Sequence, residues 1–155
     1  MKIRKYILDT NILIELIREN PQVVEHLRKV GTNRCCMSVI SSQELLYGAY
    51  NAPIRYQEQE LIRIHKVMRR FPIVPLPEDG RDFGSTKADL VKRGLIIDDF
   101  DISIAGTALK NDMTVVTDNT KHFSRIEGLK VENWMNPPGF RLPASCKKKK
   151  SPPAP

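Results

Sequence analysis

Short apolar runs alternate along this chain with longer segments of helical periodicity, and this alternation limits the possible folds more than any other feature. Runs suited to strands occur at residues 2–8, 35–40, 71–76 and 113–117, with a last short one before Trp134. Helical patterns occupy residues 12–17, 21–30, 41–52, 54–70, 79–93 and 99–112. Strands that alternate with helices are typical of an α/β fold with a mostly parallel sheet.

The length and composition indicate one globular domain followed by a tail. A chain of 155 residues with 41% hydrophobic and 28% charged residues is long enough to bury a substantial core. Beyond about Pro137 the periodicity ends. We therefore predict a folded domain over residues 1–136 and a disordered, Pro- and Lys-rich tail over residues 137–155.

Neither a membrane span nor a secretory signal is predicted. No segment approaches the ~20 apolar residues that a spanning helix needs. Asp9 interrupts the only apolar run near the N-terminus, so a signal peptide is not indicated. We expect a cytoplasmic protein that does not contact a membrane.

The net charge of +7 does not by itself identify a partner. Lys147–Lys150 supply four of these charges, which leaves +3 for residues 1–143. The lysine run is explained either by added RNA affinity or by an ordinary solvated tail. The three cysteines have no Cys-x-x-Cys spacing, so neither a disulfide framework nor a zinc site is indicated.

Acidic residues stand at the ends of several predicted elements. They are Asp9 after the first strand, Glu44 in the helix after the second, Asp98, Asp99 and Asp101 around the start of helix 99–112, and Asp118 after the fourth strand. Because parallel strands end at one edge of a sheet, these carboxylates are expected to converge there. Mg²⁺ binds oxygen ligands and would relieve their mutual repulsion.

Each acid also has an ordinary explanation as a cap or turn residue. Asp9 and either Asp98 or Asp99 suit helix N-caps, Ser41 with Glu44 fits a capping box, and Asp118 suits a turn. Taken singly, capping is the better explanation. Taken together, the acids favour a metal site, because the chain has no phosphate-binding loop or nucleophile elbow and its three histidines are scattered.

Four segments between Lys2 and Trp134 resemble the PIN domain and, within it, the VapC-type toxins of bacterial toxin–antitoxin pairs. They read YILDTNILIEL, SVISSQELLYGA, GLIIDDFDISIAGTAL and MTVVTDNTKHFSRIEGLKVENW. The resemblance implies a three-layer α/β/α architecture around a mostly parallel, twisted sheet. It also implies a Mg²⁺- or Mn²⁺-dependent endoribonuclease that cleaves tRNA, rRNA or mRNA and inhibits translation.

The resemblance assigns roles to particular residues. It implies that Asp9, Glu44 and Asp101 are catalytic metal ligands and that Asp99 is an auxiliary ligand. Many PIN domains have an aspartate where this chain has Asn119. We therefore expect Asp118 to serve as a further ligand, and Thr10, Asn11 and Asn119 to position water or substrate.

The resemblance implies partners as well. They are a second copy of the chain in a homodimer, a small VapB-like antitoxin, and operator DNA reached only through that antitoxin. The segment ELLYGAYNAPIRY, residues 44–56, either lines the antitoxin groove or belongs to the core. Two other functions stay open: a PIN nuclease of RNA processing or DNA repair, and a non-catalytic PIN-like module that binds nucleic acid or protein.

Overall fold

The computed structural model describes residues 4–135, so the predicted tail at 137–155 lies outside the described residues. The strands form one all-parallel sheet of five in the order β3-β2-β1-β4-β5. They are β1 (Tyr6–Leu8), β2 (Cys35–Ser38), β3 (Ile73–Val74), β4 (Thr114–Val116) and β5 (Lys130–Glu132). The helices are α1 (Thr10–Ile17), α2 (Pro21–Val30), α3 (Val39–Tyr50), α4 (Ile54–Met68), α5 (Arg81–Lys92), α6 (Asp99–Lys110) and α7 (Thr120–Phe123), with a 3₁₀ turn at Thr32–Arg34.

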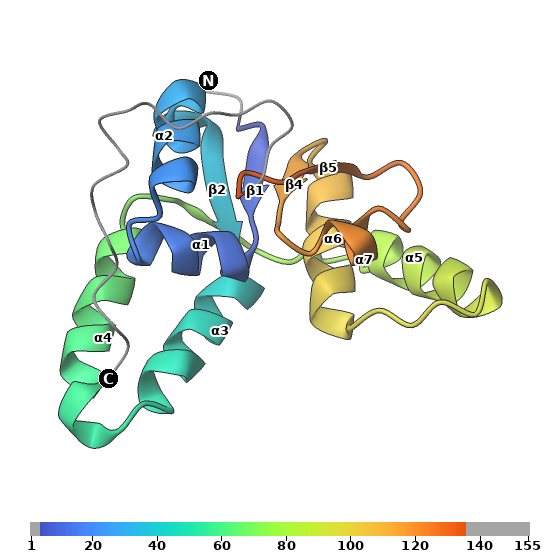
Figure 1. Cartoon of the computed structure of the whole chain (residues 1–155). Helices are drawn as coiled ribbons and strands as arrows, with labels where there is room; N and C mark the ends of the chain where they lie inside the picture. The colour runs from blue at the N-terminus through green and yellow to red at the C-terminus, as the bar shows by residue number, and fades with distance from the viewer. Residues whose placement is uncertain (1–3, 136–155) are drawn as a thin grey trace.

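Alternate residues of the central strands face two separate cores, which makes the fold a three-layer α/β/α sandwich. Leu8, paired in register with Met37 and Val116, packs against α1, α2, α3 and α4. Ile7 faces the opposite layer, where α5 and α6 cover the sheet. Figure 1 shows these two groups of helices on either side of the strands. The predicted fold class is confirmed.

The third strand, β3, lies at the edge of the sheet. β3 is only two residues long and pairs with β2 alone. Pro75 follows it directly and has no N–H with which to extend the ladder, so the strand stops there.

The predicted boundary between the second strand and its helix is wrong. Residues 35–40 were expected to form a strand, with Ser41 as the helix cap, but β2 ends at Ser38 and α3 begins at Val39. The Ser38 hydroxyl oxygen accepts a hydrogen bond from the Ser41 N–H at 3.0 Å, so Ser38 is the cap. Ile40 is apolar because the first turn of α3 is itself buried in the core.

The strand order places a topological switch point between β1 and β4. The chain runs from β1 outward through β2 to β3, then crosses to β4 and continues outward to β5 (Figure 1). The connections on either side of β1 and β4 therefore diverge at the carboxyl ends of these two strands, where α/β folds bind ligands. Within residues 4–135, no helix is long and apolar enough to cross a membrane.

Candidate active site

Asp9 lies at the switch point and is fixed by hydrogen bonds from three directions. It follows β1 directly, and its backbone N–H donates to the Val116 carbonyl of β4 at 2.9 Å. Its Oδ1 accepts from the Thr10 N–H at 2.8 Å, so it is also the N-cap of α1. Its Oδ2 accepts from the Thr117 hydroxyl at 2.7 Å and from the Asn11 amide at 3.2 Å. The side chain is only 5% exposed.

The same network joins the ends of β1 and β4. Asn11 Nδ2 donates to Thr117 Oγ1 at 3.2 Å, and Asn11 Oδ1 accepts from the Asp118 N–H at 3.1 Å. The Asn119 N–H donates to Thr117 Oγ1 at 2.9 Å. Asn11 and Thr117 therefore hold the loop after β4 against the start of α1.

Glu44 reaches this site from α3. Because α3 starts at Val39, Glu44 lies in its second turn rather than in its first. The Thr10 hydroxyl donates a hydrogen bond to Glu44 Oε2. Thr10 thus links Glu44 to the Asp9 carboxylate, because its N–H donates to Asp9 Oδ1. Burial is the main cause that raises the pKa of Asp9, and the charge of Glu44 adds a smaller contribution.

Asp101 approaches from the opposite layer, in the first turn of α6. Asn119 Nδ2 donates to its Oδ2 at 3.4 Å, and His122 Nδ1 lies 3.7 Å from the same oxygen. His122 Nδ1 and Asn119 Nδ2 are 2.9 Å apart. Asp98, the N-cap of α6, is a further negative charge that raises the pKa of Asp101.

Two of the proposed ligands have other partners. Both carboxylate oxygens of Asp99 lie 2.8 Å from Lys87 Nζ of α5, in an exposed ion pair. Asp118 is exposed, and its Oδ1 accepts from Asn133 Nδ2 at 3.1 Å. In this arrangement the structure joins Asp9, Glu44 and Asp101 into one electrostatic group and leaves Asp99 and Asp118 at its margin.

Burial and like charge act together on the central acids. Burial is the main cause that raises the pKa of Asp9 to about 6, and the hydrogen bonds from Thr117 and Thr10 partly oppose it. Asp101 and Glu44 raise this pKa further. For Asp101, burial again raises the pKa most, while His122 lowers it. The site therefore carries negative charge in a poorly solvated place.

The donor set fits a hydrated, hard divalent cation. The three central acids offer only carboxylate oxygens, which Mg²⁺ and Mn²⁺ prefer. Within residues 4–135, no three His, Cys, Asp or Glu side chains lie close enough together to hold a metal ion between them. Mg²⁺ usually keeps several waters and is held by one or two carboxylates, so a complete protein cage is not required.

Sequence reasoning missed two residues of the site. Thr117 was taken only as the end of a strand, yet its hydroxyl makes the shortest side-chain contact of Asp9. His122 was counted among scattered histidines, yet α7 brings it beside Asp101. The three-residue spacing from Asn119 to His122 was the one available signal, since one helical turn places such residues side by side.

Comparison with known proteins identifies relatives of the whole described domain. The PIN domain family model matches residues 6–129. Ribonuclease VapC2 of Haemophilus influenzae is 34% identical over 132 residues, which cover 84% of this chain and 98% of that protein. The tRNA(fMet)-specific endonuclease VapC of Shigella flexneri is 31% identical over 131 residues, with 84% and 98% covered.

Solved structures give the same result. The DNA-bound VapBC of Salmonella typhimurium has a TM-score of 0.78 at 31% identity and covers 84% of this chain and 98% of that one. VapBC2 of Rickettsia felis, bound to a DNA fragment from its promoter, has a TM-score of 0.76 at 30% identity, with 83% and 98% covered. The sequence match, the parallel sheet and the acids at its switch point lead to one conclusion: the chain belongs to the PIN-domain family and, within it, to the VapC ribonucleases.

Proposed function

We propose that this chain is an endoribonuclease toxin of a toxin–antitoxin pair, with Asp9, Glu44 and Asp101 as its catalytic residues. The observation that carries the proposal is the buried Asp9, held across the switch point by Thr117, with Glu44 and Asp101 near enough to raise its pKa. VapC nucleases of this family are generally dependent on a divalent metal. The carboxylate-only donor set favours Mg²⁺ or Mn²⁺.

The residues of this site fall into two groups, those that would bind the cation and those that orient them. Asp9, Glu44 and Asp101 would hold the cation. Because the pKa of Asp9 is about 6, this residue is mostly ionised at neutral pH. Thr117 and Asn11 orient Asp9, and Thr10 orients Glu44. A bound divalent ion supplies an acidified water and positive charge opposite the phosphoryl oxygens.

The loop after β4 contributes one more positioning residue, Asn119. Asn119 lies against Asp101 and its amide is directed at the site, so it is placed to position Asp101 and a water or phosphate oxygen. Asp99 and Asp118 remain candidate auxiliary ligands that would first have to leave Lys87 and Asn133. Their partners indicate a smaller contribution than that of the three central acids.

Partners of the chain are proposed from its relatives and its surface. The two solved structures described above are VapBC assemblies, and both are bound to DNA. By analogy, this chain binds a VapB-like antitoxin and forms a homodimer, and it reaches operator DNA only through the antitoxin. On the α3–α4 hairpin, Tyr47, Tyr50 and Ile54 are well exposed, whereas Leu45 and Ala49 are buried. The exposed side chains favour a groove role for part of residues 44–56.

The proposal is tested by cleavage of an RNA panel with and without Mg²⁺ or Mn²⁺. We expect Asp9→Asn, Glu44→Gln and Asp101→Asn each to lower the single-turnover cleavage rate constant by about 10²-fold or more. Asp112→Asn is the matched control, because Asp112 is an exposed acid that pairs with Lys130 before the start of β4, whereas the site lies after the end of that strand. A single-stranded DNA panel separates ribonuclease activity from DNA repair.

Two outcomes contradict the proposal. Cleavage that persists in all three variants would remove the catalytic assignment. Mn²⁺ is added at 100 times the concentration that gives half-maximal cleavage. If this does not add about 2.7 kcal/mol to the free energy of unfolding, the metal that supports cleavage is not bound by the folded protein alone. The chain would then be better described as a non-catalytic PIN-like module.

A further inference from the structure

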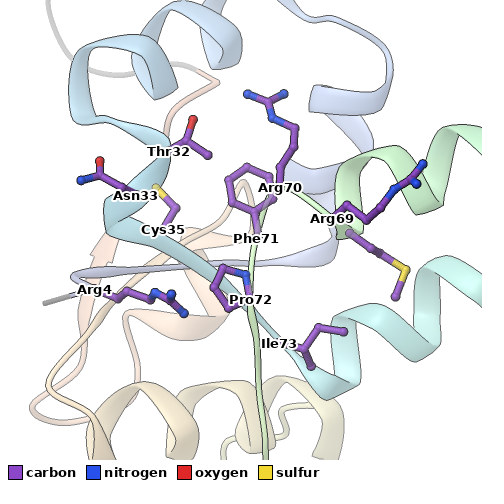
Figure 2. A pocket seen from close by; sticks show the side chains of 10 residues that line it. Arg4, Thr32, Asn33, Cys35, Arg69, Arg70, Phe71, Pro72 and Ile73 are labelled. Atoms are coloured by element: carbon purple, nitrogen blue, oxygen red, sulfur yellow. The ribbon is translucent and has the colours of Figure 1, made fainter. Parts of the chain in front are cut away.

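A broad, open cleft lies at the amino ends of the strands, whereas the carboxylates lie at their carboxyl ends. Its volume is about 780 Å³. The residues before β1, β2 and β3 line it, and its floor includes Cys35 and Phe71, which are buried. Figure 2 shows Arg4 on one side, directed toward Pro72, with Arg69 and Arg70 across from it. No proposed catalytic residue lines this cleft.

The charge of the cleft is entirely positive. Its lining contains Arg4, Arg69 and Arg70 and no acidic residue. Among the residues that the structure describes, none forms a salt bridge with these three arginines. Thr32 and Asn33 add hydroxyl and amide donors to the same lining.

Helix capping explains only part of this cluster. Arg69 and Arg70 follow α4, where positive charge favours the helix dipole. Arg4 belongs to a different segment, before β1, so capping of α4 does not explain its presence in the same lining. Three guanidinium groups in one lining make a patch of positive charge that a bound polyanion would neutralise. Guanidinium groups also bind phosphate through two parallel hydrogen bonds.

We propose that this cleft binds backbone phosphates of a folded RNA substrate while another part of the same RNA lies at the carboxylates. The inference rests on the proposed ribonuclease function and extends its RNA-binding surface to the opposite edge of the sheet. The cleft is too open to enclose a small anion, and binding sites for small ligands bury most of the ligand. A polyanion that lies across the surface fits it better.

The distance between the two sites decides which RNA can reach both. Arg4 and Asp9 are five residues apart on one extended segment, whose pairing starts at Lys5, so about 17 Å separates the two edges. A folded RNA can contact both edges at once. An oligonucleotide of about two or three nucleotides, at ~3.4 Å per nucleotide, is too short to extend from the carboxylates to the cleft. The cleft therefore selects for the size and shape of the RNA.

The test compares the double variant Arg69→Gln/Arg70→Gln with the matched control Arg55→Gln/Arg63→Gln. The control removes two arginines that lie within α4 and outside the cleft, whereas Arg69 and Arg70 follow that helix. Binding of full-length tRNA is measured in EDTA over a series of salt concentrations. We expect the double variant to lower the slope of log affinity against log salt by about 0.7–0.9 per arginine, and the control to leave it nearly unchanged.

A second variant and a second substrate keep the test decisive. Arg4→Gln is expected to lower the slope by about half as much as the double variant, even if removal of Arg70 from the Phe71 ring disturbs the fold. With Mg²⁺ present, both variants should cleave a short single-stranded oligonucleotide at the parent rate. Both should be slower than the parent on folded RNA.

Three results overturn the inference: an unchanged slope, an equal loss in the control, or a poly-glutamate peptide that binds the cleft more tightly than tRNA does. The last result would assign the cleft to an acidic protein segment. Failure of the proposed function is seen separately, as absence of cleavage by the parent protein. In that case the binding data still decide whether the cleft holds RNA.

Discussion

Asp9 illustrates how one residue carries a cost in stability for the sake of the site. Its pKa is about 6 in the folded protein against a usual value of 3.8, mainly because it is buried. The folded state therefore holds this proton more tightly than the unfolded chain does. Protonated Asp9 favours folding at low pH, and this stabilisation is lost as the pH rises from 3.8 to about 6. The difference corresponds to about 3 kcal/mol.

We therefore predict that Asp9→Asn stabilises the metal-free protein at neutral pH while it removes activity. In EDTA at pH 7.5, the free energy of unfolding should rise by about 1–3 kcal/mol, and at pH 4 the gain should disappear. The gain can be as small as about 1 kcal/mol, because Thr117 and Asn11 both donate hydrogen bonds to Asp9 Oδ2. An amide nitrogen at this position cannot accept these hydrogen bonds. Urea unfolding at both pH values measures this, and equal destabilisation at both would contradict it.

His122 provides a second prediction at this scale. Its ring lies beside Asn119 and Asp101 and is placed to orient both. Partners that orient a metal ligand usually contribute 10–100-fold to metal affinity. We expect His122→Ala to raise the Mn²⁺ concentration needed for half-maximal cleavage by about tenfold, with less effect at saturating metal. His65→Ala, an exposed histidine on α4, is the control. Equal metal dependence in both variants would limit His122 to a structural role.

Sequence reasoning identified the residues that stand at ends of regular elements and missed those placed by irregular chain. Asp9 directly follows β1, Asp101 lies in the first turn of α6, and Glu44 lies in the second turn of the helix after β2. The topology therefore brings all three toward the carboxyl ends of the strands. His122 reaches the site only because a one-turn helix, α7, follows the loop after β4. A helix of four residues is too short to show a periodic pattern in the sequence, so the direction of the His122 side chain could not be predicted.

At the scale of elements, the start of α3 determines where Glu44 points. The Ser38 hydroxyl caps this helix and is fully buried. We predict that Ser38→Ala lowers the free energy of unfolding by about 1 kcal/mol, because the Ser41 N–H then loses its acceptor. Ser41→Ala should cost less, since the Ser41 hydroxyl makes a single hydrogen bond, with Ser38. Urea denaturation of both variants measures the difference, and the reverse order would restore Ser41 as the cap.

The elements themselves were largely predictable, and their boundaries were less so. The α/β class follows from alternating patterns, and the edge position of β3 follows from Pro75. The boundary at Ser38 was misjudged because Val39 and Ile40 extend an apolar run. A buried helix start and a buried strand end have the same hydrophobic composition, so only the hydrogen bond of the Ser38 side chain distinguishes them.

At the scale of the whole molecule, the two edges of the sheet carry opposite charge. The carboxyl edge gathers Asp9, Glu44 and Asp101, and the amino edge gathers Arg4, Arg69 and Arg70. An RNA is repelled by the first edge until a cation is bound and is attracted by the second. The modest net charge of residues 1–143 conceals this separation, which is why composition alone did not identify the partner.

The last prediction concerns the extent of the folded unit. We propose that residues 1–136 fold without residues 137–155. The relatives align over 84% of this chain and 98% of their own length, so the C-terminal part of this chain exceeds what they need to fold. The family model ends at residue 129, and the last strand, β5, ends at Glu132.

A chain that ends at Asn136 should therefore keep its free energy of unfolding within about 0.5 kcal/mol of the full chain, since changes away from packed features usually cost no more. It should also cleave a short oligonucleotide at the same rate. Changing Lys147–Lys150 to glutamine in the full chain separates charge from length. If only the truncation destabilises the protein, by more than about 1 kcal/mol, residues 137–155 are part of the folded domain and the predicted boundary is wrong.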